Sequence, residues 1–147
     1  VRVLVESAVD LVSIRSYEGL EGKEREETVA RISERYGLNL EDLREQVYRA
    51  RLFDAIIGKP HRDDEDKLLI PVEGRVLLVD HEEAFPVDSS IDFMVPVACN
   101  VLHGDVELSL ETLDHQKLEI ELGPYLNGEQ IAALLERRNK IFERCKQ

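Results

Sequence analysis

Two acidic stretches of the chain contain the residue types of a cation site. The first is His61-Arg62-Asp63-Asp64-Glu65-Asp66 and the second is Asp80-His81-Glu82-Glu83. The apolar runs between them are separated by a turn with Gly74, which predicts a β-hairpin. Antiparallel pairing brings the start of the first strand near the end of the second, so Asp66 and Asp80 are expected to lie close together. Because two adjacent carboxylates repel each other, we expect a hard divalent cation between them, and Mg²⁺ with substrate phosphates fits better than a full Ca²⁺ cage.

Two other interpretations of these acids stay open. Acidic loops in a chain of formal net charge -12 are usually solvated surface. A transition metal is the other alternative, since imidazole and carboxylate groups form a common ligand set. Its ligands would be His61, Asp63, Asp80 and His81. Since His81 directly follows Asp80, their side chains point to opposite faces of a strand, which favours packing or exposure of His81 over ligation.

The elements that must position these residues are mostly helices. Asn39 can cap a long helix that ends at Ile57, where Gly58 and Pro60 stop it. Short strands are expected at 68–70 and 76–79, and residues 84–104 are expected to be mostly irregular. Asn127 and Gln130 have the spacing of a capping box before the last helix. The expected stripe of that helix consists of Ile131, Leu134, Leu135, Arg138, Ile141 and Phe142.

The order of these motifs resembles the catalytic half of kinase-like phosphotransferases, in particular the lipid-kinase-like and HipA-like bacterial proteins. The similar stretches are Phe53–Ile57, His61-Arg62-Asp63-x-x-Asp66, Leu68–Ile70 and Val79–Phe85. The interval from Asp66 to Asp80 is also that of the family between the last ligand of the catalytic loop and the metal-binding Asp. Near the end of the chain, Tyr125-Leu126 and the segment Ala133–Ile141 resemble the family's closing helix. The similarity covers roughly residues 41–141.

This resemblance implies a phosphotransferase that uses ATP and Mg²⁺. Asp80 would be the principal metal ligand and Asp66 the second, while Arg62 would hold the catalytic loop. His61 stands where the family has its catalytic Asp, and Asp63 is an alternative base. The implied fold class is α+β: a mostly helical kinase-like C-terminal lobe with one short β-hairpin that carries the metal site. Residues 1–23 would be an N-terminal segment or the remnant of a preceding lobe, and residues 24–147 the helical lobe.

The chain departs from the family pattern in ways that argue against intact kinase activity. His61 and Asp66 replace the catalytic Asp and the metal-binding Asn, and no Gly-rich loop precedes Glu24. The chain also begins at Val1, so an origin as a piece of a longer protein stays open. We therefore expect an incomplete or degenerate lobe that requires a missing N-terminal lobe or a partner subunit. The alternatives are a catalytically inactive kinase-like binding module and a plain helical interaction domain.

Composition excludes several classes of partner. The 147 residues include 19 Lys and Arg against 31 Asp and Glu, a balance that repels nucleic acid and anionic membrane surfaces. The sequence contains no membrane-spanning run and no leader sequence, so we expect a cytoplasmic protein. Cys99 and Cys145 are too few for a disulfide scaffold, and Cys99 is expected to be a buried structural thiol. The apolar stripe of the last helix, if uncovered, would allow a homo-oligomer.

Overall fold

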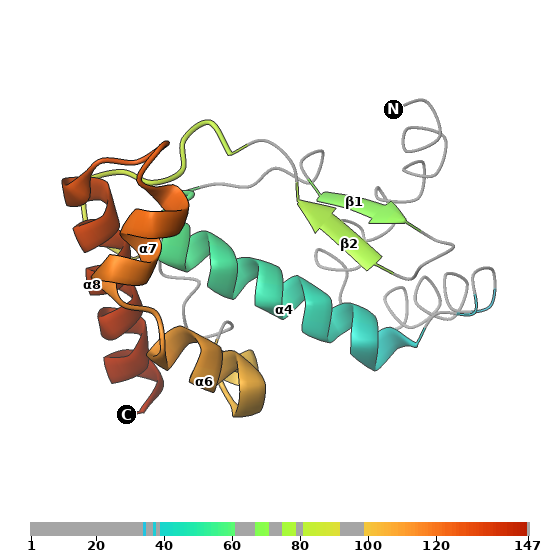
Figure 1. Cartoon of the computed structure of the whole chain (residues 1–147). Helices are drawn as coiled ribbons and strands as arrows, with labels where there is room; N and C mark the ends of the chain where they lie inside the picture. The colour runs from blue at the N-terminus through green and yellow to red at the C-terminus, as the bar shows by residue number, and fades with distance from the viewer. Residues whose placement is uncertain are drawn as a thin grey trace. The chain divides into compact units, whose positions relative to one another are not determined.

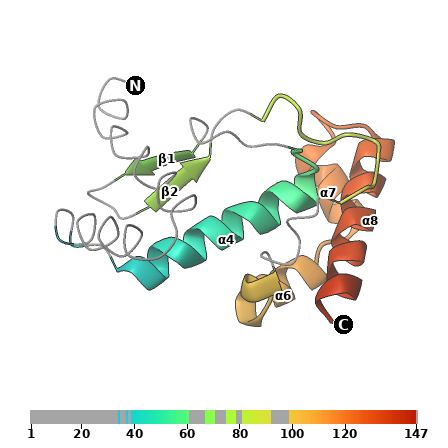
Figure 2. The same ribbon diagram turned by 180° about the vertical axis from the view of Figure 1, so that it is seen from behind.

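The computed structural model describes residues 34, 37, 39–60, 67–70, 75–78, 81–91 and 99–146. These residues belong to two compact units, one formed by residues 1–47 and 62–80 and the other by residues 48–61 and 81–147. Figures 1 and 2 show the chain from opposite sides. Most of the described residues are helical, as the sequence predicts. The division at residue 23 stays a prediction.

Helix α4 spans Leu40–Ile57, as the sequence predicts. Asn39 begins it: its Oδ1 accepts hydrogen bonds from the backbone N–H groups of Glu41 (2.9 Å) and Asp42 (3.4 Å). Gly58 ends it with a φ of 72°, a conformation that glycine adopts without steric cost. The Lys59 N–H then donates to the Asp54 carbonyl (2.9 Å). Local signals are therefore sufficient to define both ends of α4.

In the unit formed by residues 1–47 and 62–80, two strands form an antiparallel pair. Strand β1 is Lys67–Ile70 and strand β2 is Arg75–Leu78. In their register, Lys67 is opposite Leu78 and Ile70 is opposite Arg75. The two strands lie side by side (Figure 1). The first residue of β1 therefore pairs with the last residue of β2.

In the other unit, the described residues that follow the irregular segment 81–91 are mostly helical. A short 3₁₀ helix, η3 (Cys99–Val101), precedes α6 (Gly104–Glu111), α7 (His115–Leu122) and α8 (Gly128–Cys145). The predicted capping box of α8 is confirmed, because the Gln130 N–H donates to Asn127 Oδ1 and the Asn127 N–H donates to Gln130 Oε1, both at 2.9 Å. Helix α7 packs against α8.

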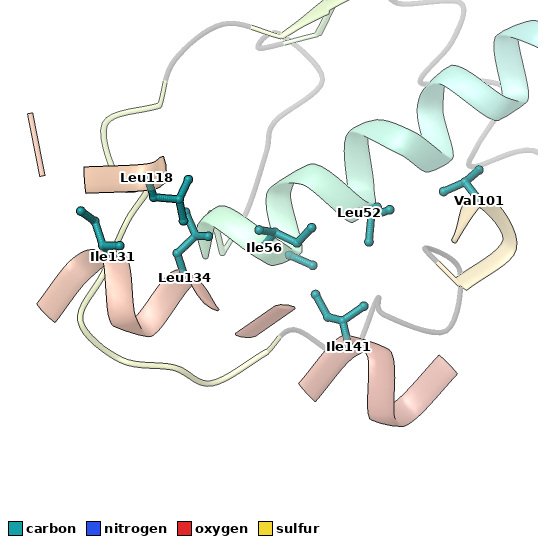
Figure 3. Packing of buried hydrophobic residues seen from close by; sticks show 8 residues of the cluster. Leu52, Ile56, Val101, Leu118, Ile131, Leu134 and Ile141 are labelled. Carbon is teal, nitrogen blue, oxygen red and sulfur yellow. The ribbon is translucent and has the colours of Figure 1, made fainter. Parts of the chain in front are cut away.

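The core of this unit lies where the last turns of α4 meet α7 and α8. Figure 3 shows its aliphatic side chains directed toward one another. Ile131 and Ile141 on α8 are each only 1 % exposed, and Val101 of η3 is 2 % exposed. Burial of this apolar area is the main favourable term in folding of the unit. The cluster consists of Leu52, Ala55, Ile56, Val101, Leu118, Ile131, Leu134 and Ile141.

A disulfide joins the two cysteines, so the prediction of a free buried thiol at Cys99 is wrong. Cys99 on η3 bonds to Cys145 at the end of α8, with their Cα atoms 5.3 Å apart. The two residues are 46 positions apart in the sequence. Cysteine spacing alone does not reveal such a pair, because the approach of the two residues depends on how η3 and α8 pack.

We predict that loss of this disulfide destabilises the protein by about 2–4 kcal/mol, because the bond restricts the unfolded chain. The double variant Cys99→Ser/Cys145→Ser should unfold at a lower urea concentration than the oxidised protein. Reductant should lower the midpoint of the wild-type protein and leave that of the variant unchanged. Equal midpoints of the wild-type protein with and without reductant would contradict the prediction.

Within the part of the chain that the structure describes, no helix has the length and apolarity needed to cross a membrane.

Candidate functional site

The residues of the predicted cation site lie outside the described part of the chain. These residues are His61, Arg62, Asp63, Asp66 and Asp80. Their catalytic and metal-binding roles therefore stay predictions. His81, a ligand in the transition-metal alternative, is described and exposed. Its ring contacts Phe53 edge to face, with ring centroids 6.0 Å apart. Among the described residues, no group of three or more His, Cys, Asp or Glu side chains could hold a metal ion.

The best-defined polar arrangement is formed by Arg137 of α8. This residue is fully buried, and its guanidinium donates to three backbone carbonyl groups. Nε binds the Ile56 carbonyl at 2.8 Å, and one terminal nitrogen binds the carbonyls of Pro86 (3.1 Å) and Asp88. Burial lowers the pKa of Arg137, whereas the nearby charge of Asp88 acts in the opposite direction. Arg137 thus connects α8 to the end of α4 and to segment 81–91.

Further hydrogen bonds fix segment 81–91 in place. The Phe85 N–H donates to the Ile57 carbonyl (2.6 Å), and Gln130 Nε2 donates to the Phe85 carbonyl (3.0 Å). Lys140 Nζ donates to the Ser89 carbonyl (3.0 Å) and to Ser89 Oγ (2.9 Å). Since Gln130, Arg137 and Lys140 all belong to α8, this helix holds the segment along much of its length. These hydrogen bonds fix the backbone path of segment 81–91, which has no regular secondary structure.

Asp88 is held by a local turn. Its Oδ1 accepts from the Ser90 N–H (2.8 Å) and its Oδ2 from the Ser90 hydroxyl (3.0 Å). These bonds to Ser90 lower the pKa of Asp88, with a smaller contribution in the same direction from the positive charges of Lys140 and Arg137. Asp88 is therefore a carboxylate at neutral pH.

A cavity of about 470 Å³ lies between the end of α4 and segment 81–91. Its volume falls within the roughly 300–1,000 Å³ of ligand pockets in proteins. Lys59 is only 6 % exposed and Asp54 only 9 %. Apolar groups form much of the remaining wall. The lining residues are Asp54, Ala55, Gly58, Lys59, Pro60, Glu83, Pro86, Asp88, Ser90 and Ile91. Glu83 and Asp88 are exposed, so the cavity combines a small apolar surface with carboxylates that face solvent.

Comparisons with known proteins give no match to any family model, curated protein or solved structure.

Sequence analysis missed both Arg137 and the cavity. It placed Arg138 in the stripe of the last helix, whereas Arg137 is the buried residue. The spacing contained a usable signal, because Arg137 follows Leu134 by three positions and precedes Ile141 by four. Arg138 is instead partly exposed, and its guanidinium donates to the carbonyls of Leu110 (3.0 Å) and Leu113. An arginine between two core positions at helical spacing indicates a buried charge that binds carbonyl groups.

We predict that Gly58→Ala destabilises the protein by about 2–4 kcal/mol, since it adds a strained φ and a steric clash. A Cβ atom at residue 58 would lie 2.8 Å from Pro86 Cδ and 3.0 Å from Arg137 Cζ. Gly104 is the matched control, because its φ is also positive (54°) but nothing lies within 4 Å of an added Cβ. Urea unfolding of both alanine variants measures the difference. Equal losses would show that Gly58 is required only for its backbone angle.

We predict that Arg137→Met costs about 2–4 kcal/mol of stability, because three backbone carbonyls lose their donors while the apolar volume is largely kept. Arg137→Lys should recover only part of the loss, since an ammonium group cannot reproduce the planar fork. Arg144→Met, on an exposed position of the same helix, is the control and should change stability by less than about 0.5 kcal/mol. Chemical denaturation checks this ranking, and an Arg137→Met variant as stable as Arg144→Met would refute it.

Proposed function

We propose that this chain is the helical lobe of a kinase-like phosphotransferase, which binds Mg²⁺ and ATP and is active only together with an N-terminal lobe or partner subunit. The sequence motifs carry the resemblance to that class. The order of the described elements agrees with them: a long helix ends shortly before residues 61–66, an antiparallel strand pair follows, and further helices come after it.

The register of the strand pair is the observation that carries this proposal. Lys67 is opposite Leu78. Asp66 directly precedes the first of these residues, and Asp80 follows the second by two positions. This pairing supports a site in which both carboxylates bind one cation, because each acid adjoins the same end of the strand pair along the chain.

The chemistry follows from the charge of a transferring phosphoryl group. Bound Mg²⁺ would neutralise the negative charge that spreads over the phosphate oxygens during transfer. Asp80 and Asp66 would provide its protein ligands. His61 or Asp63 would accept the proton of the attacking hydroxyl, and Arg62 would hold the loop through its planar fork.

A catalytically inactive kinase-like binding module is the second candidate. Two features of the sequence favour it: His61 stands at the position of the catalytic Asp, and Asp66 at that of the metal-binding Asn. Such a module would keep the fold and would have lost the catalytic base. Restoring both positions with His61→Asp/Asp66→Asn should then increase affinity for Mg²⁺ and ATP.

The sequence predicts a cytoplasmic location, and the disulfide argues against that prediction. Structural disulfides persist mainly in oxidising compartments, whereas cytosolic thiols are kept reduced. The Cys99–Cys145 bond therefore favours an extracytoplasmic environment or an oxidised state of the protein. Thiol labelling of protein taken directly from cells tests whether the two cysteines are bonded to each other there.

Calorimetry with ATP in the presence and absence of Mg²⁺ tests the metal site. We expect Mg²⁺-dependent binding of ATP that Asp80→Asn or Asp66→Asn weakens at least about tenfold, or ~1.4 kcal/mol. Asp105→Asn removes an exposed carboxylate on α6 and serves as the control. If neither the wild-type chain nor His61→Asp/Asp66→Asn gives heat on titration with ATP and Mg²⁺, both kinase-like proposals are wrong. A plain helical interaction domain is then the remaining interpretation. In that case Asp80→Ala should also be neutral or stabilising, because it removes like-charge repulsion.

A further inference from the structure

The disulfide joins η3 to the last turn of α8 at the edge of the core. Cys145 follows Ile141 by four positions, so the two residues share one side of α8, and Cys145 packs against the core cluster. Cys99 at the start of η3 packs against the same cluster and is bonded to Cys145. Because neither cysteine is fully buried, we expect a thiol reductant to reach the bond in the folded protein.

The segment that follows Cys99 has little buried surface of its own. No residue of α6 is buried, whereas α7 buries Leu118 and α8 buries Ile141. Val101 is the one buried residue of segment 99–113, which the structure describes throughout. In Figure 3 it lies at the same end of the cluster as Leu52 and Ile141. A segment with so few buried apolar contacts opens locally at a lower cost in free energy than a core helix does.

The polar contacts of α6 are also weak. Lys146 Nζ lies 3.9 Å from a carboxylate oxygen of Glu107 and 3.8 Å from one of Glu111. Ion pairs between solvent-exposed side chains contribute little to stability. The Arg138 guanidinium adds a hydrogen bond to the Leu110 carbonyl (3.0 Å). The covalent bond at Cys99 is therefore the strongest constraint on the position of this segment.

Reduction changes what the segment gains when it opens. While the bond is intact, one end of segment 99–113 is tied to the end of α8 and the other continues into α7. Without the bond the first end is free, so the opened segment gains conformational entropy. Opening withdraws Val101 from the cluster and exposes Leu52 and Ile141 to water.

We propose that the Cys99–Cys145 bond is a redox-controlled clasp: the oxidised form holds segment 99–113 on the core, and the reduced form releases it. A dithiol reduces the bond in two steps. Its thiolate attacks one sulfur to form a mixed disulfide, and its second thiol then displaces the remaining cysteine thiolate. The products are two cysteine thiols and the disulfide of the reductant, so two electrons and two protons pass to the protein. The clasp does not depend on the proposed Mg²⁺ and ATP site.

Limited digestion with a glutamate-specific protease tests this proposal, because Glu107 and Glu111 lie on α6 and Glu136 lies on α8. The oxidised protein and the protein reduced with dithiothreitol in native buffer are digested, and mass spectrometry gives the cleavage rate after each residue. We expect reduction to raise cleavage after Glu107 and Glu111 at least about tenfold relative to cleavage after Glu136. Removal of the dithiol and oxidation with glutathione disulfide should restore the slow cleavage.

Two variants serve as controls. Cys99→Ser/Cys145→Ser should be cleaved like the reduced wild-type protein, and reductant should not change its rates. Lys146→Met removes the surface ion pairs and keeps the disulfide, so the oxidised variant should be cleaved like the oxidised wild-type protein. Cleavage of oxidised Lys146→Met as fast as that of the reduced wild-type protein would overturn the proposal, because the ion pairs would then hold α6.

Other outcomes would also overturn it. A bond that dithiothreitol reduces only in denaturant is a permanent structural bond. Equal cleavage after Glu107 in the oxidised and reduced proteins would show that the segment stays on the core without the bond. If cleavage after Glu136 rises as much as cleavage after Glu107, reduction unfolds the whole unit. Fast cleavage that persists after reoxidation would show that the release is not reversible.

Discussion

The hydrogen bonds of one buried guanidinium fix segment 81–91 against α4 and α8. Arg137 reaches from α8 to the last carbonyls of α4 and to the backbone of segment 81–91. Aliphatic side chains of the core define which faces meet, but they do not specify the path of an irregular segment. Directional donors do so, because each carbonyl must lie within hydrogen-bond distance of a fixed planar group. Gly58 completes the arrangement, since any side chain there would occupy the space of Pro86 and Arg137.

The same arrangement explains how a positive charge is tolerated in the interior. Helix α4 has acidic residues in its first turn and no basic residue in its last turn, so its own sequence leaves the negative end of the helix dipole uncompensated. Arg137 supplies a positive charge there from another helix, through the Ile56 carbonyl. Lys59 follows two residues after the end of α4 and adds a second positive charge. Carbonyl groups and the helix dipole thus substitute for a carboxylate partner of Arg137.

Sequence reasoning succeeded where the signal was local. Asn39 and Gly58 delimit α4, and Asn127 with Gln130 begins α8, because caps depend on residues within one turn of each other. It failed for interactions between distant residues. Arg137 and Ile56 are 81 positions apart, and the Cys99–Cys145 bond spans 46. No local sequence pattern indicates that residues so far apart along the chain come into contact. The predicted cation site depends on Asp66 and Asp80, which lie outside the described residues, and it stays a prediction.

The end of α4 leads along the chain into the first acidic stretch of the predicted cation site. Residues 48–61 and 81–147 form one unit, so the chain leaves this unit after His61 and re-enters it at His81. The residues on both sides of that excursion are fixed within the unit: the Lys59 N–H binds the Asp54 carbonyl, and the His81 ring contacts Phe53. Both acidic stretches therefore adjoin backbone that α4 and α8 hold in place. A binding site benefits from such rigid supports, because ordering a mobile side chain on binding costs conformational entropy and weakens the affinity for the ligand.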